Sequence, residues 1–460
     1  MNPSPLPQRV RRVAFAAIFV SAVLQGAAIA RGADDPLARA ADRLERQLAA
    51  AGAHERVDRD ESFVPLSLDA LRQITRRGPD ALIEHACNAL EQRLFADAAD
   101  RRLDQHTLLD AALIASGVTN KDDLQRYQDQ REALLRKFRS SPPTASPGTI
   151  PSPPMASRGT TPSPPTASPG TIPSPPMASV GTHSPAPSLP QPHDEHHRLA
   201  VALFDFMHEH VLDGGYRLEC TDLRVVLDRG RYNCVSSSVL YKSLGDALGL
   251  RIVGLEMPGH ALLRLQLDDG RAIDIETTCP QWFHLKDRPE QRRHRLREQL
   301  GEVAAGDRST AREVSPVDLA AMIYYNRGVG LLAERRFAEA AIANAKALHL
   351  DPRNEIAQGN LLATLNNWAI AMGESGRFAE AVEVIEAGLA IDPDYKTFAQ
   401  NYVHVHHQWT ERLVAEGRFD EACQRLRRAT AVMPDRPYLR QTLGEIERRR
   451  AAQQHGYRGT

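Results

Sequence analysis

The spacing of apolar residues predicts a helical region, a mixed region and a second helical region, in that order. From 63 to 139, leucine and isoleucine recur at helical intervals; one helix should carry Leu82, Leu90 and Leu94, and Asn120 should begin another. Residues 193–285 combine helical spacing with short apolar runs typical of strands, and 315–455 are helical throughout. The fold class expected is α+β, with all-α blocks before and after the sheet.

The last helical region is built from an internal repeat. Arg-Phe-x-Glu-Ala recurs every 41 residues at Phe337, Phe378 and Phe419, and Pro437 opens a final polar helix suited to capping the stack. The pattern resembles tetratricopeptide repeats, which are helix pairs with a usual period of about 34 residues. The seven additional residues make about two turns, so we expect three hairpins with first helices of about 19 residues. The resemblance implies a groove that binds a protein or peptide partner.

Three segments lack the pattern of a folded domain. Residues 31–62 are charged and rich in alanine, and we interpret them as a loosely helical or disordered tether. In residues 140–192, Ser-Pro-Pro recurs with an 11-residue period, and so few apolar side chains cannot offset the entropy of ordering. This segment is predicted to be a disordered linker. Residues 286–314 are highly charged and are predicted to be a connector.

The N-terminus has the three parts of a secretory signal. Arg9, Arg11 and Arg12 precede an apolar run from 13 to 30, which ends in Ala-Ile-Ala. We interpret 1–30 as a cleaved signal peptide, so the protein is expected to be exported, to a bacterial periplasm or outside the cell. The alternative is an uncleaved membrane anchor formed by residues 13–30, because about 18 residues nearly suffice to span a bilayer.

Cys234 stands at the start of a predicted helix. Apolar residues follow it at helical spacing, and Gly249 is placed to end the helix. Unpaired N–H groups and the macrodipole at a helix N-terminus favour a thiolate over a thiol. The alternative is a small buried cysteine without chemistry, which is the more common role of a single cysteine.

A histidine and two carboxylates follow on adjacent predicted strands. His260 begins a strand after Pro-Gly, and a hairpin loop at 268–270 leads into Asp274 and Glu276. A three-residue loop places His260, Asp274 and Glu276 on one face, with Arg264 opposite Asp274. A two-residue loop would put both acids on the other face. We therefore expect Glu276 to orient His260, with Asp274 as the second candidate.

These strings, in this order, resemble the transglutaminase-like core. The resemblance rests on Tyr-Asn-Cys-Val-Ser around Cys234, Pro-Gly-His at His260 and Ile-Glu-Thr-Thr at Glu276, within 193–285 and more loosely over 63–139. It implies a papain-like α+β fold, in which the cysteine helix packs on an antiparallel sheet. It also implies attack by Cys234 on an amide carbonyl, with His260 as base and then acid. The family's acid is usually Asp, whereas Glu276 stands here.

Composition narrows the remaining possibilities. Lys plus Arg (57) nearly equal Asp plus Glu (58), so no strongly basic surface indicates a nucleic-acid partner. The five cysteines form no metal or disulfide pattern, although Cys220 and Cys279 could pair in an oxidising compartment. The histidines at 193–197 are too crowded to close a tetrahedral metal site, and no phosphate loop or dinucleotide fingerprint occurs. No cofactor or metal is therefore expected.

Two functions remain open from the sequence. The first is an exported thiol enzyme of transglutaminase-like type, a peptidase, amidase or acyltransferase, whose repeats recruit a substrate or partner. The second is a scaffold in which the same core is catalytically inactive and the repeats bind a protein. Labelling of Cys234 by an acyl probe would separate the two.

Overall fold

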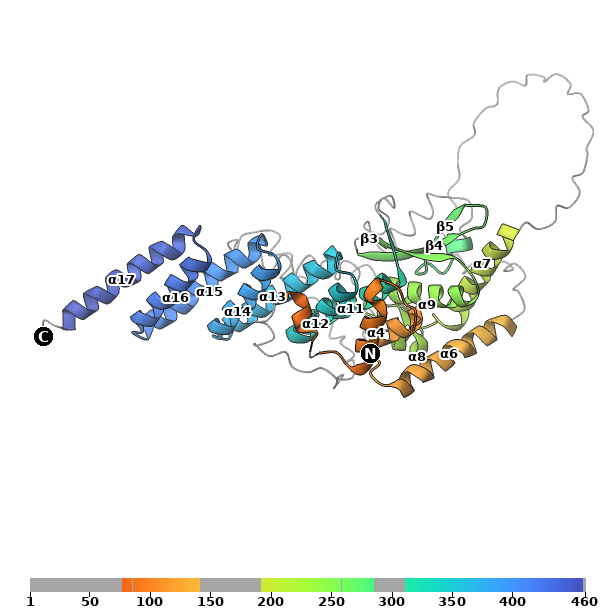
Figure 1. Cartoon of the computed structure of the whole chain (residues 1–460), viewed down its shortest axis with the longest axis horizontal. Coiled ribbons are helices and arrows are strands. Elements are labelled where there is room, and N and C mark those ends of the chain that lie inside the picture. The colour runs from red at the N-terminus through yellow and green to blue at the C-terminus, as the bar shows by residue number, and fades with distance from the viewer. Residues whose placement is uncertain (1–76, 85, 141–191, 258, 285–310, 458–460) are drawn as a thin grey trace, which may run out of the picture.

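The computed structural model describes residues 77–84, 86–140, 192–257, 259–284 and 311–457 (Figure 1). The predicted signal peptide, the tether at 31–62 and nearly all of the linker lie outside the described residues, as does most of the connector. A sheet and its surrounding helices occupy one end of the molecule, and a row of helices extends from it to the C-terminus. Among the described residues, no helix has both the length and the apolar character needed to cross a bilayer.

The larger sheet is antiparallel and has the strand order β5-β4-β3-β6. Its strands are β3 (Ile252–Met257), β4 (His260–Gln266), β5 (Ala272–Ile275) and β6 (Arg312–Val314). Between β4 and β5, the Leu267 N–H donates to the Arg271 carbonyl at 2.9 Å, and Gly270 has φ +82°. Arg264 consequently pairs with Asp274. This is the register predicted from a three-residue loop with a left-handed glycine.

Strand β6 corrects the predicted connector. Residues 312–314 were expected to belong to the charged segment 286–314, but they pair antiparallel with β3 along its outer edge. Arg312 and Glu313 gave no strand signal because three residues are too few to show an alternating pattern. One residue, Ser315, then separates the strand from the first helix of the repeat array. The sheet therefore extends past the predicted core boundary at 285.

The helix α9 (Cys234–Ala247) packs against β3 and β4. Asn233 starts it with a capping box, because its side-chain oxygen accepts from the N–H groups of Val235 and Ser236, both at 3.0 Å. Gly249, with φ +80°, follows the helix end as predicted. Around α9 lie α7 (Pro192–His210), α8 (Leu223–Arg229) and a small parallel pair, β1 (Gly215–Tyr216) with β2 (Arg231–Tyr232).

The N-terminal block is helical, as expected, but its second helix is broken. Its elements are η1 (Pro79–Leu82), α4 (Ala89–Asp97), η2 (Ala98–Asp100), α5 (Leu108–Ala115) and α6 (Lys121–Ser140). The prediction of one helix through Leu82 and Leu94 is wrong, because the Asn88 side chain accepts from two backbone N–H groups and begins a new helix. Asn120 begins α6, accepting from the Asp123 N–H at 2.8 Å, as predicted.

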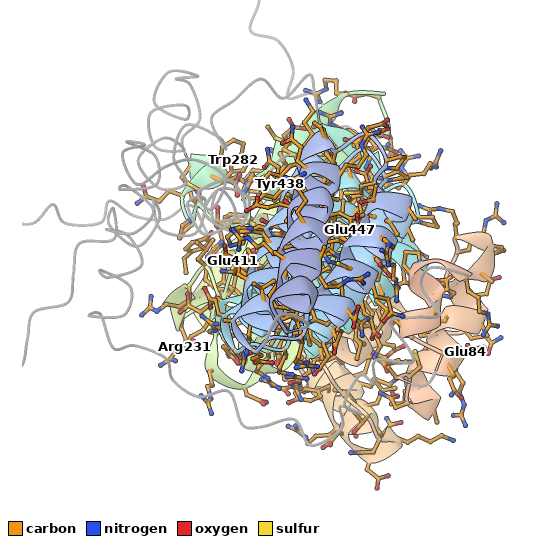
Figure 2. All side chains as sticks on the ribbon, turned by 90° about the vertical axis from the view of Figure 1, so that its left-hand side faces the viewer. Glu84, Arg231, Trp282, Glu411, Tyr438 and Glu447 are labelled. Atoms are coloured by element: carbon orange, nitrogen blue, oxygen red, sulfur yellow. The ribbon has the colours of Figure 1, made fainter. Side chains whose placement is uncertain are left out.

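The C-terminal region consists of helices stacked in pairs. They are α11 (Pro316–Ala333), α12 (Phe337–Leu350), α13 (Glu355–Glu374), α14 (Phe378–Ile391), α15 (Lys396–Ala415), α16 (Phe419–Val432) and α17 (Pro437–Tyr457). The first helices have 18, 20 and 20 residues and the second helices 14 each, so the additional residues lengthen the first helices as the period predicts. Viewed end-on, α17 closes the stack, with Tyr438 exposed and Glu447 bound to Arg427 at 2.6 Å (Figure 2).

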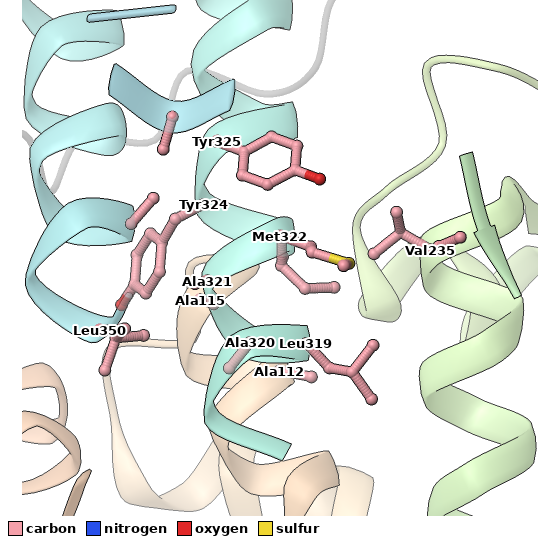
Figure 3. Packing of buried hydrophobic residues seen from close by; sticks show 14 of the residues in the cluster. Ala112, Ala115, Val235, Leu319, Ala320, Ala321, Met322, Tyr324, Tyr325 and Leu350 are labelled. Carbon is pink, nitrogen blue, oxygen red and sulfur yellow. The ribbon is translucent and has the colours of Figure 1, made fainter. Parts of the chain in front are cut away.

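Helix α11 belongs to two cores. One side packs on α5 and α9, and the other packs on α12 (Figure 3). Most of the buried apolar residues consequently form one continuous cluster from Leu82 to Ile446, and two small clusters, around Leu255 and around Leu331, lie apart from it. A buried ion pair reinforces the same junction, because Lys346 on α12 bonds both oxygens of Glu91 on α4 at 2.7 Å. Tyr324 on α11 donates to Glu91 at 3.0 Å.

Candidate active site

Cys234 occupies the first position of α9 and is 8% exposed. The Asn233 cap uses the next two backbone N–H groups and leaves that of Cys234 directed out of the helix end. Asn233 is itself fixed by Thr221, whose hydroxyl oxygen accepts from the Asn233 amide at 2.5 Å. The local sequence Asn-Cys-Val-Ser therefore places the sulfur at a rigid, positively polarised helix N-terminus.

His260, the first residue of β4, connects the thiol to a buried carboxylate. Its Nε2 atom lies 2.7 Å from Oε2 of Glu276, and its ring lies close enough to the Cys234 side chain to interact with it electrostatically. Since Nε2 is taken by Glu276, Nδ1 is the nitrogen that remains for the sulfur. Glu276 is fully buried, and its other oxygen accepts from the Thr278 hydroxyl at 2.6 Å and the Thr278 N–H at 3.2 Å. Cysteine, imidazole and carboxylate thus form a continuous chain of contacts.

The charges in this chain stabilise one another. Burial opposes protonation of His260, but the Glu276 charge and the hydrogen bonds to Cys234 and Glu276 outweigh it and raise the pKa of His260 to about 10. Burial also opposes ionisation of Glu276. The charge and hydrogen bond of His260, together with the Thr278 hydrogen bonds, nevertheless lower the pKa of Glu276 below 4.5. The site therefore holds an imidazolium–carboxylate pair near neutral pH.

Asp274, the second candidate acid, lies in a different environment. Arg264 Nε donates to its side chain at 2.8 Å, and its backbone carbonyl accepts from the Trp282 indole N–H at 2.7 Å. Asp274 is therefore held by a structural ion pair, and Glu276 is the acid that faces His260. The register of the hairpin decides between them, because Glu276 follows the end of β5 on the same face.

The geometry agrees with a comparison of the sequence with known families. Residues 183–320 match the model of the Transglutaminase-like superfamily. The chain contains a transglutaminase-like domain. No curated protein and no solved structure gave a match. The matched range ends inside α11, so it includes β6 and the first turn of that helix, in agreement with the sheet seen here.

Two groups at the transglutaminase-like site escaped the sequence reasoning. Thr278 donates two hydrogen bonds to Glu276, and a hydroxyl two residues after a buried acid is a sequence signal that could have identified it. Tyr325 on α11 reaches Glu256 on β3, with its hydroxyl 3.1 Å from Oε1. No sequence signal marks it, since it lies far along the chain from the triad and within the repeat region.

The remaining cysteines and the histidine-rich segment form neither a disulfide nor a metal cluster among the described residues. All five cysteines are free thiols, so Cys220 and Cys279 are not bridged. His196, from the histidine-rich helix start, lies 3.0 Å from Asp268. Within the part of the chain that the structure describes, no three histidine, cysteine or acidic side chains gather as a metal site.

Proposed function

We propose that the transglutaminase-like domain is a thiol enzyme that acts on an amide or peptide bond. The observation that carries the proposal is the chain of contacts from Cys234 through His260 to Glu276. Its charge distribution, with imidazolium beside carboxylate at a helix N-terminus, is what a cysteine nucleophile requires. Glu276 takes the orienting role in which the family usually has aspartate.

The reaction follows from the positions of these groups. The Cys234 thiolate attacks the amide carbonyl carbon, and the oxyanion that forms meets the Cys234 N–H left by the Asn233 cap. His260 gives its proton to the leaving nitrogen as the C–N bond breaks, and a thioester remains on Cys234. His260 then takes a proton from an incoming water or amine, which attacks the thioester and releases the thiolate. Water makes the enzyme a peptidase or amidase, and an amine makes it an acyltransferase.

Glu276 has a distinct task in both steps. Its hydrogen bond to Nε2 fixes the ring so that Nδ1 faces the sulfur, and its charge stabilises the imidazolium. The chain itself supplies every group that these steps use, so the proposal requires no metal or cofactor.

The remaining parts of the chain extend this proposal. The N-terminal pattern supports export, with anchoring in a membrane only if residues 13–30 are not cleaved. The stacked hairpins at 315–455 support a tetratricopeptide-like array that binds a protein or peptide and brings it to the domain. Nothing in the charge balance favours a nucleic-acid partner.

One observation favours a second function, an inactive domain that serves as a protein-binding scaffold. Cys234 is 8% exposed, and the His260 side chain is 3% exposed. A carbonyl carbon can reach the sulfur only if neighbouring groups move. Many folds keep the outline of a site without its activity.

A cysteine-reactive acyl probe separates the two functions. Rapid labelling of Cys234 that is lost in His260→Ala supports the enzyme. Cys220 provides an internal reference, because it is half-buried and burial raises its pKa to about 11. Labelling of Cys234 no faster than Cys220, or equally fast without His260, supports the scaffold.

A further inference from the structure

The first hairpin helix carries a tyrosine into the neighbourhood of the thiol. Tyr325 is 8% exposed on α11, and its hydroxyl donates to Glu256 on β3. Glu256 precedes Met257, which is paired with His260 across the β3–β4 hairpin. The hydrogen bond therefore joins the repeat array to the strand beside the catalytic histidine.

The packing of α11 brings Tyr325 toward the cysteine helix. Met322, one turn earlier on α11, points toward Val235, the residue after Cys234 (Figure 3). The hydroxyl of Tyr325 points to the α9 side of α11, whereas Tyr324 points to the opposite side, near Leu350. The two adjacent tyrosines thus serve different interfaces.

Glu256 is a buried carboxylate with every lone pair engaged. It is 7% exposed. Oε1 accepts from Tyr325 and from the Asn354 amide at 3.2 Å, and Oε2 accepts from Nε of Arg312 at 3.1 Å and from a terminal nitrogen of Arg312 at 2.5 Å. A buried carboxylate that loses one donor keeps its charge with less compensation. The Tyr325 hydroxyl therefore changes the negative electrostatic potential that Glu256 produces at neighbouring groups.

The charged groups around Glu256 do not cancel. Arg312 also binds Asp351 at 2.7 Å, and Arg101 binds Asp318 and Asp351. Among the described residues, three carboxylates share two guanidinium groups in this cluster, so one negative charge is in excess there. Negative charge near a cysteine disfavours the thiolate that the proposed reaction needs.

The titratable groups around Cys234 come from several elements. His260 comes from β4 and interacts electrostatically with the thiol, with Glu276 behind it just after the end of β5. Tyr325 comes from α11, close enough to Cys234 to interact with it electrostatically, and Glu256 on β3 lies behind Tyr325. The pKa of Tyr325 is raised well above 10, mainly by burial and then by the nearby Glu256 and Cys234. The hydroxyl of Tyr325 therefore stays a neutral donor. Further back, Tyr232 on β2 contacts His208 on α7, with ring centroids 6.0 Å apart.

We propose that Tyr325 is a positioning residue of the thiol site, which holds the Glu256 carboxylate and compensates part of its negative charge on the side of α11 that faces the cysteine helix. This inference rests on the proposed function. It makes the site composite, because the repeat array supplies a group on which the reactivity of the thiol depends.

The test compares two single-atom deletions on the same helix in the full-length chain. Tyr325→Phe removes the donor to Glu256, and Tyr324→Phe removes a donor to Glu91 on the far side of α11. Both tyrosines are buried and each loses one hydrogen bond to a glutamate, so both variants should lose similar stability, measured by thermal unfolding. The readout is the iodoacetamide alkylation rate of Cys234, followed by peptide mass spectrometry between about pH 6 and pH 10.

Tyr325→Phe should slow alkylation roughly three- to tenfold at about pH 6 and leave it unchanged at about pH 10, where the thiolate forms regardless. Tyr324→Phe should follow wild type at every pH. In a Glu256→Gln background, which removes the charge, Tyr325→Phe should no longer shift the profile. A Tyr325→Phe profile that matches Tyr324→Phe, or a slowing equal at all pH values, overturns the inference while a reactive wild-type Cys234 still supports the enzyme. An unreactive wild-type Cys234 refutes the proposed function itself.

Discussion

Replacing Glu276 by glutamine tests whether the buried carboxylate controls the reactivity of the thiol. The change keeps the shape of the side chain and removes its charge. The pKa of His260 rises from its ordinary 6.5 to about 10, and Glu276 contributes two of the four interactions that raise it. At about 1.4 kcal/mol per pH unit, the whole rise is worth about 5 kcal/mol. If Glu276 provides half, its loss removes about 2–3 kcal/mol, a factor of about 30–100 in the ratio of imidazolium to neutral imidazole.

The assay is the iodoacetamide alkylation rate of Cys234, measured from about pH 5.5 to 10 with Cys220 as the slow internal reference. Glu276→Gln should slow the reaction by up to about 30- to 100-fold, most strongly above about pH 8, where His260 with its lowered pKa no longer stays protonated beside the thiolate. The matched control is Asp274→Asn, which breaks the contact with Arg264 and leaves His260 untouched. It should stay within about twofold of wild type.

The pH dependence of stability has a definite sign. The pKa of His260 is raised in the folded state. The contribution of His260 to the free energy of unfolding is therefore fully present below about pH 6.5 and is lost as the pH rises through about 10. The pKa of Glu276 is lowered, so its contribution to the free energy of unfolding is present above about pH 4.5 and is lost as the pH falls through the folded-state pKa.

In the alkylation assay, equal slowing by Glu276→Gln and Asp274→Asn, or no slowing by Glu276→Gln, would refute Glu276 as the residue that orients His260.

Three further predictions concern the rest of the chain. Gly388→Ala should destabilise the helix array, because a Cβ at this position would lie 2.2 Å from the Phe398 ring. Gly359→Ala is the matched control: it has open space around it and should stabilise the protein by about 0.5–1 kcal/mol in denaturant unfolding. Lys346→Met should cost about 3–5 kcal/mol by the same measurement, since it leaves Glu91 buried without its cation, and adding Glu91→Gln should recover part of that loss. Replacing 141–191 by a short Gly-Ser linker should leave the melting temperature and Cys234 labelling nearly unchanged, because closure entropy varies slowly with loop length; a large loss would show that this segment packs on the fold.

The sequence reasoning succeeded where one residue determines local geometry. A three-residue loop with a left-handed Gly270, one of the two loops considered, sets the register, and that register puts Glu276 rather than Asp274 against His260. Asn233 and Gly249 likewise bound the cysteine helix where expected. In these places turn and cap chemistry act within a few residues, so the sequence contains the information.

It failed where the structure depends on contacts between distant segments. Strand β6 exists because β3 has a free edge to pair with, and nothing in Arg312-Glu313-Val314 indicates a strand. Tyr325 approaches the site only because α11 packs on α9. The break before α4 is different in kind, since Asn88 did carry a local capping signal that the helical periodicity of the leucines obscured.

The sharing of α11 between two cores has a consequence for how the protein unfolds. In stacked repeats each unit contacts only the units next to it, and the stability of the array is approximately the sum of these local terms. Here the first hairpin cannot open without exposing the apolar surfaces of α5 and α9, whereas α17 at the far end is covered on one side only. Hydrogen exchange should therefore show a gradient of protection along the array, slowest in α11 and fastest in α17. The array can therefore unfold from its C-terminal end without exposing the residues around Cys234.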